Sequence, residues 1–386
     1  MAATKQDGGA LAALMKAALA LPVLAVPMRS GAAETGEIGF SVLGYKERDL
    51  MKITEPVLWT RFSFAETWEF RASILMDIIT GASPRVVSNQ GGTPVQTITG
   101  ASITDRRKGA DAKLTKRLGD FTFSASRTIS DEVDYDSRAF GLEATWDLNQ
   151  KLTTLTAGYG KANDRVGSRD NPQLHERRDT KEYLIGVTQV LSPLAIVQSS
   201  LQFSRGDGYY NDPYKITFTF PPPGSEGIPQ LAADVRPGSR DSLAWLTRYR
   251  QHVPASKGTL QAEYRFFRDD WGIRAHTLEA AWEQEINEAW SVRPALRYYT
   301  QSAADFYSPV IPTPRPAVLS SDQRLSAFGG LSPSVRGIWR HDSGVLVEGT
   351  VGYYYNAKDL RLGGDGSSAF NTLRAWYVFG SIIKEF

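Results

Sequence analysis

Few side chains in this sequence have both the type and the spacing that catalysis requires. The four histidines are His175, His252, His276 and His341. Only His276 has a hydroxyl group beside it, at Thr277, and a carboxylate nearby, at Glu279. Nucleophilic catalysis needs a nucleophile, a base and a group that orients the base within reach of one another. Nothing marks a nucleophile beside His276, so the preferred interpretation is that this histidine lies near a strand end without a catalytic role. We therefore expect no catalytic residues and no enzymatic activity.

Two groups of oxygen ligands could bind a hard cation such as Ca²⁺. The first group is Asp131, Glu132, Asp134 and Asp136, and the second is Asp207, Asn211 and Asp212. The first group lacks the glycine and the closing glutamate of a helix–loop–helix calcium site, so a solvated loop tip is the preferred interpretation, and the second is equally ambiguous. The absence of cysteine excludes disulfides, thiol chemistry and cysteine-ligated metals. We expect no metal and no cofactor.

The composition excludes two further classes of protein. Of the 386 residues, 44 are Lys or Arg and 42 are Asp or Glu, so the formal charge is only +2 and gives no electrostatic case for nucleic acid. No internal apolar run reaches the roughly 18 residues that a transmembrane helix needs. Apolar side chains must therefore be organised in another way.

Residues 242–301 show how they are organised. Apolar or aromatic side chains recur there at every second position in four successive runs. In the first run, Leu243, Trp245, Thr247 and Tyr249 alternate with Ala244, Leu246, Arg248 and Arg250. A period of two is typical of β-strands, because successive side chains leave the backbone on opposite sides. The four runs predict an antiparallel meander.

Three features favour a membrane barrel over a soluble sandwich: charges in the middle of strands, aromatic residues near strand ends, and connections that alternate between short and long. The fold class is therefore expected to be all-β, an antiparallel up-and-down transmembrane barrel of about sixteen strands with long extracellular loops. The side chains expected to face the lumen are Arg248, Arg250, Glu263, Arg265, Glu279, Glu283, Arg293 and Arg297. They could brace the wall as cross-strand ion pairs or create a transverse field that screens solutes, and both interpretations stay open.

The connections define a topology. Short connections are predicted at residues 65–67, 118–120, 147–150, 191–193, 252–257, 286–288 and 341–344. If these are periplasmic, every long connection is extracellular. Residues 80–104 are expected to be a long connection and 206–236 the longest irregular stretch, and both are expected to constrict the pore. The last strands are predicted near 323–340, 345–356 and 371–386.

The two ends of the chain carry expected export and assembly signals. Lys5 and Lys16 precede an apolar run, and small residues follow it, so residues 1–33 are predicted to be a cleaved signal peptide. Residues 34–386 form the barrel domain. The terminal Phe386 resembles the signal that barrel-assembly machinery recognises, although Lys384 departs from that pattern.

Several strings resemble those of one family, the bacterial outer-membrane family catalogued as domain of unknown function 3570. They lie at residues 81–84, 206–215, 236–240, 268–279 and 298–307. The resemblance implies a secreted β-barrel without an established activity, and it implies a redox-related system with flavin-transfer and thioredoxin-like partners. Most of these strings lie in predicted loops, where recognition usually resides. The loop residues expected to recognise a partner are Asp207, Tyr209, Tyr210, Asn211, Asp212, Asp269, Asp270 and Trp271.

Three functions are therefore carried forward. The first is a passive or weakly selective porin-like channel in the outer membrane of a Gram-negative bacterium. The second is a non-conducting barrel that holds or displays an extracytoplasmic partner. The third, ranked low, is a lipid hydrolase at His276. The expected partners are outer-membrane lipid, the barrel-assembly machinery and a periplasmic or extracellular protein, with no nucleic acid.

Overall fold

A computed structural model describes residues 35–48, 51–81, 84–90, 93–98, 103–219, 230–368 and 370–386. The predicted signal peptide at 1–33 and the proline triplet at 221–223 lie outside these residues. Within the described residues, no helix has the length and apolar character needed to cross a membrane.

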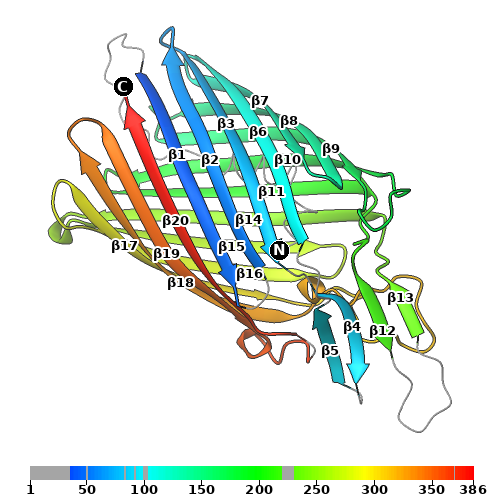
Figure 1. The fold of residues 1–386 in the computed structure, drawn as a ribbon. Coiled ribbons are helices and arrows are strands. Elements are labelled where there is room, and N and C mark those ends of the chain that lie inside the picture. The colour runs from blue at the N-terminus through cyan, green and yellow to red at the C-terminus, as the bar shows by residue number, and fades with distance from the viewer. Residues whose placement is uncertain are drawn as a thin grey trace.

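Sixteen antiparallel strands form one closed barrel (Figure 1), which confirms the predicted fold class and the even strand count. Strands that follow one another in the chain pair with each other, except that β3 pairs with β6, β11 pairs with β14, and β1 pairs with β20 to close the barrel. The strands are β1 Thr35–Glu47, β2 Met51–Phe64, β3 Trp68–Gly81, β6 Ile103–Leu118, β7 Phe121–Asp131, β8 Tyr135–Leu148, β9 Thr153–Val166, β10 Glu176–Ser192, β11 Ala195–Gly208, β14 Ser239–Val253, β15 Gly258–Asp269, β16 Arg274–Glu285, β17 Trp290–Gln301, β18 Phe328–His341, β19 Val345–Ala357 and β20 Leu373–Glu385.

The barrel closes where the first strand meets the last. β1 pairs with β20 from Glu37 opposite Glu385 to Glu47 opposite Ala375. The pairing extends to the end of the chain, because the Phe386 amide donates to the Gly36 carbonyl at 2.9 Å and the Gly36 amide donates to the Phe386 carbonyl at 2.8 Å. An unpaired edge in lipid would cost several kcal/mol for each exposed backbone group. Closure removes that cost.

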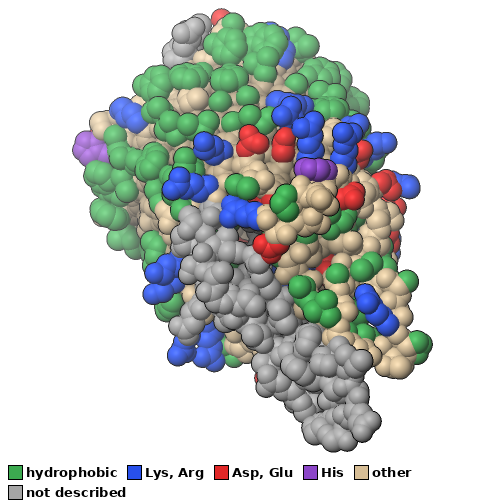
Figure 2. Space-filling model, turned by 45° about the vertical axis from the view of Figure 1, so that its right-hand side comes forward, with side chains coloured by type: hydrophobic (Ala, Val, Ile, Leu, Met, Phe, Trp, Pro, Cys, Tyr) green, Lys and Arg blue, Asp and Glu red, His purple; other side chains and the backbone are tan. Residues whose placement is uncertain are grey.

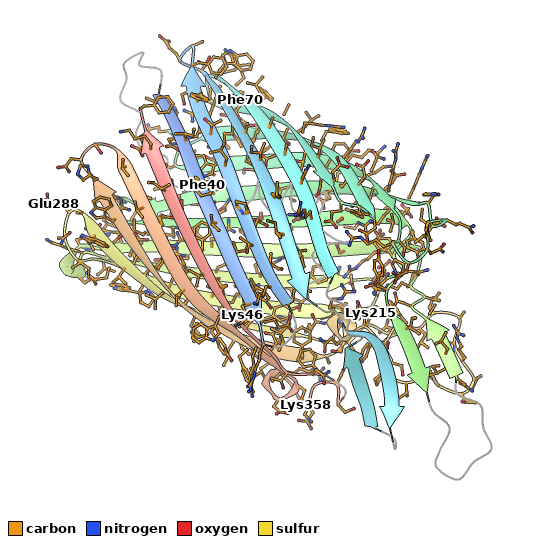
Figure 3. The ribbon with its side chains drawn as sticks, viewed as in Figure 1. Phe40, Lys46, Phe70, Lys215, Glu288 and Lys358 are labelled. Carbon is orange, nitrogen blue, oxygen red and sulfur yellow. The ribbon has the colours of Figure 1, made fainter. Side chains whose placement is uncertain are left out.

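The outer surface of the barrel is apolar. Ile74, Leu278 and Leu296 have exposed fractions of 57%, 54% and 50%, and Phe40 has 46%. Phe40 and Phe70 lie on the strand walls in Figure 3, and hydrophobic side chains cover much of the surface in Figure 2. Exposed apolar area of this extent marks a surface that meets another apolar phase, here acyl chains.

The inner surface is polar, and contacts that skip a strand demonstrate it. The Arg107 guanidinium lies 3.9 Å from Glu55 across β3, and Lys113 Nζ lies 3.1 Å from Glu143 across β7. Only side chains on the concave face of a curved sheet converge enough to meet over an intervening strand. The charged face of each strand therefore points into the barrel, as the alternation predicts.

The two rims differ in the length of their connections. The seven predicted short turns all lie at one rim, and the structure confirms each of them. Glu288 lies at this rim, whereas Lys358 lies at the other (Figure 3). The opposite rim carries the long connections, among them residues 209–238, 302–327 and 358–372. Short turns face the periplasm in bacterial barrels, so the long connections are assigned to the extracellular side.

A second sheet stands beyond the extracellular rim (Figure 1). Its order is β13-β12-β4-β5, and its strands are β4 Pro84–Gln90, β5 Thr93–Ile98, β12 Ile216–Thr219 and β13 Gln230–Ala233. The prediction that 206–236 is irregular was therefore wrong at 216–219 and 230–233, and the predicted connection 80–104 contains β4 and β5. The predicted strand at 323–340 begins only at Phe328, because Gln323–Leu325 is a 3-10 turn in which the Arg324 amide donates to the side chain of Asp322. The last strand begins at Leu373 rather than 371.

Two glycines of β18 provide a matched test of packing. A Cβ at Gly329 would lie 2.0 Å from the Leu360 carbonyl oxygen, whereas a Cβ at Gly337 would meet nothing within 4 Å. Gly329→Ala should displace the extracellular turn at Lys358–Leu360 and destabilise the barrel by about 1–3 kcal/mol, as overpacking does. Gly337→Ala should leave stability unchanged. The temperature at which the folded gel mobility is lost measures both, and equal temperatures for the two variants would contradict the packing.

Candidate functional site

The candidate site lies on the inner wall of the barrel formed by β14 to β17. Arg248 Nε lies 2.7 Å from Glu263 Oε2 on the neighbouring strand. Arg293 donates to Gln261 across β16 at 3.0 Å, and Gln261 donates to Glu283 at 3.3 Å. Of the remaining predicted lumen residues, Arg250 and Glu279 lie within electrostatic reach of Arg293. Arg265 and Arg297 line a cavity on the same wall. The structure therefore brings all eight to one face, although a role in conduction stays a prediction.

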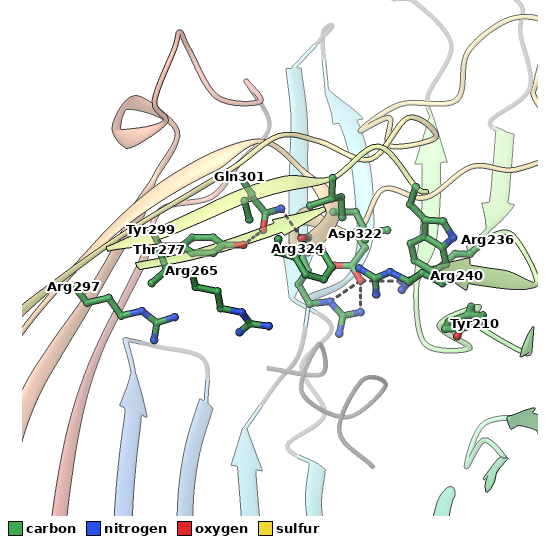
Figure 4. Close-up of a pocket in the computed structure, with 15 residues that line it drawn as sticks. Tyr210, Arg236, Arg240, Arg265, Thr277, Arg297, Tyr299, Gln301, Asp322 and Arg324 are labelled. Carbon is green, nitrogen blue, oxygen red and sulfur yellow. Dashed lines mark hydrogen bonds and ion pairs between the residues drawn. The ribbon is translucent and has the colours of Figure 1, made fainter. Parts of the chain in front are cut away.

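A cavity of about 250 Å³ opens on this wall. Arg265, Thr277, Arg297 and Tyr299 contribute to it from the strands. Arg236 and Arg324 contribute from the extracellular connections that fold inward over the wall (Figure 4). Guanidinium groups thus surround a space large enough for a small organic anion.

A buried ionic cluster holds the two inward-folded connections together. Arg236 lies 2.7 Å from Asp234 and 2.9 Å from Asp322. Arg324 pairs with Asp322 and, at 2.6 Å, with Asp212. The Asp322 side chain is only 1% exposed. Buried charges need partners of this kind, and removing one partner leaves an uncompensated charge.

The cluster stays ionised because its charges are mutually compensating. Burial alone would raise the pKa of Asp322, but Arg324, Lys215 and Arg236 outweigh burial and hold this pKa well below its ordinary value. Burial alone would lower the pKa of Arg324, but Asp322 and Asp212 outweigh it and raise that pKa. Asp322 and Arg324 therefore remain a charged pair at neutral and mildly acidic pH.

The wall itself contributes a clamp for the 302–327 connection. Gln301, the last residue of β17, donates through Nε2 to the Arg324 carbonyl at 2.9 Å and to the Ser326 carbonyl at 2.7 Å. Its Oε1 accepts from the Tyr299 hydroxyl at 2.5 Å. The side-chain amide is thus fully used, and it fixes the connection directly beside the cavity.

Aromatic and cationic side chains hold the 209–238 connection against the same wall. The Tyr210 ring packs edge-on to Trp271 at 5.3 Å, with the Arg178 guanidinium 5.1 Å from its centre. Arg240 lies 4.5 Å from the Trp271 ring and pairs with Asp269 at 2.8 Å. Cation–aromatic contacts are stronger away from water, as they are here.

The inward turn of this connection depends on a glycine. Gly208 has φ of +130°, and a Cβ there would lie 2.2 Å from the Arg177 carbonyl oxygen. No other residue fits such a backbone position without strain. The chain therefore leaves β11 and folds back over its inner face.

Most of the residues predicted to recognise a partner serve this anchoring. Tyr210 and Trp271 are 6% and 3% exposed, Asp212 pairs with Arg324, and Asp269 pairs with Arg240. The others hold neighbouring backbone or remain accessible: the Asn211 side chain accepts from the Arg236 amide, the Asp270 side chain accepts from the Asp241 amide, Tyr209 is half-buried and Asp207 is exposed. Recognition of a partner by these residues stays a prediction.

The ionic cluster was not predicted from the sequence. The charges of this cluster come from two connections that are far apart in the sequence. Arg236 and Asp322, for example, are 86 residues apart. The run of small polar residues at 320–322 was the available signal, since such residues favour tight, capped turns. The described parts of 80–104 extend β3 and β6 or stand in the outer sheet, and 216–219 and 230–233 stand in that sheet too. The connection residues that reach the cavity are Tyr210, Arg236, Asp322, Arg324 and Leu325.

The hydrolase candidate does not assemble. His276 lies on the outer face, where its Nδ1 is 2.8 Å from the Tyr264 hydroxyl. Thr277 lies on the inner face and lines the cavity, so His276 and Thr277 point to opposite sides of the wall. His341 ends β18 and bonds Ser343 at the short-turn rim, as predicted. Among the described residues, no three His, Asp or Glu side chains gather closely enough to hold a metal ion.

The fold and this wall define an outer-membrane β-barrel. A family model described as a protein of unknown function (DUF3570) matches residues 11–175 and 167–377. The chain therefore belongs to this family. No curated protein matches the sequence.

Solved outer-membrane barrels share the architecture. A bacterial polysaccharide outer membrane secretin aligns with a TM-score of 0.50 at 8% identity, covering 92% of this chain and 99% of that chain. CdiB from Acinetobacter baumannii aligns with a TM-score of 0.52 at 9% identity, covering 91% of this chain and 60% of that chain. Identities this low establish the fold alone.

Removal of one charge from the cluster should release the inward-folded connections. Asp322→Asn removes a buried carboxylate that pairs with both Arg236 and Arg324. The free energy that holds the two connections in place should fall by about 3–5 kcal/mol. Trypsin cleavage after Arg324, followed by fragment mass, should accelerate by about two orders of magnitude. Asp365→Asn, which removes an exposed carboxylate from another extracellular connection, should leave cleavage unchanged. Equal cleavage of Asp322→Asn and the parent protein would contradict the anchoring.

Proposed function

We propose that the protein is a passive, weakly selective channel of the outer membrane. The supporting observation is a closed sixteen-strand barrel whose concave face is polar and charged. Barrels of this strand number leave an aqueous lumen unless other chain segments fill it. Tyr210 and Arg236 of one extracellular connection, and Asp322, Arg324 and Leu325 of another, reach this wall beside the arginine-lined cavity. We propose that they narrow the lumen there.

The wall charges favour small anions. Arg265 and Arg297 face the cavity together with Arg236, Arg240 and Arg324, and Asp322 is the single acidic residue of its lining. Arg297 has no ion pair among the described residues, although Glu279 is its cross-strand neighbour. Guanidinium groups bind carboxylates and phosphates through two parallel hydrogen bonds. The proposed solutes are therefore small carboxylates or phosphates, with cations passing less readily.

Planar bilayers test the channel directly. The folded protein should produce discrete conductance steps, and the reversal potential in a KCl gradient should indicate anion preference. Arg265→Gln with Arg297→Gln should lower the anion-to-cation permeability ratio about twofold to fivefold. The reason is that two screened charges together change the interaction free energy of a passing ion by roughly 0.5–1 kcal/mol. Arg127→Gln with Arg138→Gln, which removes two exposed charges, should not change it. Folded protein without any open state would reject the channel.

A second candidate, a scaffold that displays a partner, is favoured by the sheet beyond the rim. β5 and β13 are the edges of this sheet, and exposed edges can pair with another chain. A scaffold of this kind would not conduct. Cross-linking from β13 to an extracytoplasmic protein, with conductance absent, would support this candidate over the channel.

Assembly is proposed to follow export, with residues 1–33 removed and the barrel-assembly machinery reading the C-terminal strand. Deletion of Phe386 removes two backbone hydrogen bonds to Gly36 and a ring contact with Phe62 at 5.8 Å. The fraction of protein with folded gel mobility in the outer membrane should fall several-fold, whereas Phe386→Tyr should retain it. A deletion variant that assembles normally would contradict the role of this residue.

A further inference from the structure

A row of basic side chains crosses the outside of the barrel near the extracellular rim. Lys161 on β9 lies opposite Lys181 on β10, which lies opposite Arg205 on β11. Lys181 is exposed, the Arg205 side chain is 60% exposed, and Lys161 is half-buried. These three residues form a basic ladder. Figure 2 shows Lys and Arg side chains, interspersed with acidic ones, bordering the hydrophobic surface.

The basic ladder directly follows an aromatic row. Phe140, Tyr159, Tyr183 and Phe203 contact one another across β8 to β11, with ring centres 6.0, 5.4 and 6.3 Å apart. Aromatic rows of this kind mark the boundary between acyl chains and headgroups. The ladder residues of β9, β10 and β11 stand two positions farther toward the extracellular rim, about 7 Å along a strand. That height is the level of lipid headgroups.

Stability of the barrel does not explain the basic ladder. Like charges directly opposite each other on neighbouring strands are destabilising. Within the described residues, neither Lys161 nor Lys181 makes a side-chain hydrogen bond or an ion pair. Arg205 has only loose pairs with Asp207 at 3.7 Å and Asp241 at 3.9 Å. An anion between the lysines would remove their repulsion.

Other charges around the basic ladder are consistent with an anion that approaches from the membrane. The next row outward contains Asn163, Asp179 and Asp207, and the Asn163 side chain bonds Asp179. These carboxylates lie on the extracellular side of the ladder, and the apolar aromatic row lies on its membrane side. A ligand with acyl chains and a phosphate would meet the rings first and the basic groups second.

We propose that the basic ladder binds the phosphate group of a phosphorylated glycolipid in the outer leaflet, with its acyl chains against the aromatic row. Lysines contact the phosphate as point charges, and Arg205 can donate two parallel hydrogen bonds. A similar pair recurs elsewhere on the rim, where exposed Lys46 lies opposite exposed Lys52 and beside Trp376. The binding surface is independent of whether the lumen conducts.

Native mass spectrometry of the detergent-solubilised barrel with added lipid A, the doubly phosphorylated diglucosamine lipid, tests this site. Lys161→Gln with Lys181→Gln should weaken retention of the lipid about tenfold or more, the effect of two charges near a membrane surface. The control removes the same charge at the opposite rim, where Lys151→Gln with Lys257→Gln should retain the lipid as the parent protein does. Fully dephosphorylated lipid A should bind weakly to the parent protein. Its retention should match that of lipid A on the variant with Lys161→Gln and Lys181→Gln, called the ladder variant.

A second measurement separates binding from a structural role. Without lipid, Lys161→Gln with Lys181→Gln should unfold at an equal or higher temperature than the parent, because repulsion has been removed. With lipid A, the parent should gain thermal stability and the ladder variant should gain much less. Equal retention by both double variants, equal binding of dephosphorylated lipid, or equal stabilisation by inorganic phosphate alone would overturn the proposal.

Discussion

The structure depends on one constraint, that backbone polar groups in contact with acyl chains have no water to bond. Sixteen strands satisfy this constraint only as a closed ring, and the ring is completed where β1 pairs with β20 and where Phe386 exchanges two hydrogen bonds with Gly36. Closure then fixes the direction of every side chain. Alternate residues must face lipid or lumen, so one period of two in the sequence determines both an apolar exterior and a charged interior.

The rigid wall gives the extracellular connections a surface on which to fold. Gln301 ends β17 and holds Arg324 and Ser326 of the 302–327 connection, whereas Trp271 lies in the turn between β15 and β16 and packs against Tyr210 of the 209–238 connection. The buried pair between Asp322 and Arg324 then joins the two connections to each other through Asp212 and Arg236. The arginine-lined cavity is therefore a product of loop anchoring and strand alternation together. The proposed selectivity of the cavity and its stability should respond to different residues, since Arg297 lines the cavity but takes part in none of these anchoring ion pairs.

Patterns that are local in sequence predicted the fold well. The alternation around Trp245 and Leu278 placed the correct side chains outside, and the position of each short turn followed from breaks in that alternation. Contacts between distant segments could not be predicted in this way. β12 pairs in parallel with β4, about 130 residues earlier, and no local period marks either partner. Likewise Asp322 meets Arg236 only because two connections fold inward, so the charges appeared in the sequence as isolated loop residues.

The most direct test of this account uses the absence of cysteine from the chain. Single cysteines replace Leu278 and Glu279, which are neighbours on β16 with opposite orientations, and a water-soluble thiol reagent is applied to the barrel in lipid vesicles. The account predicts rapid labelling of Glu279→Cys, which faces an aqueous lumen, and protection of Leu278→Cys, which faces acyl chains. Protection of Glu279→Cys with labelling of Leu278→Cys would contradict the assignment of lumen and lipid faces.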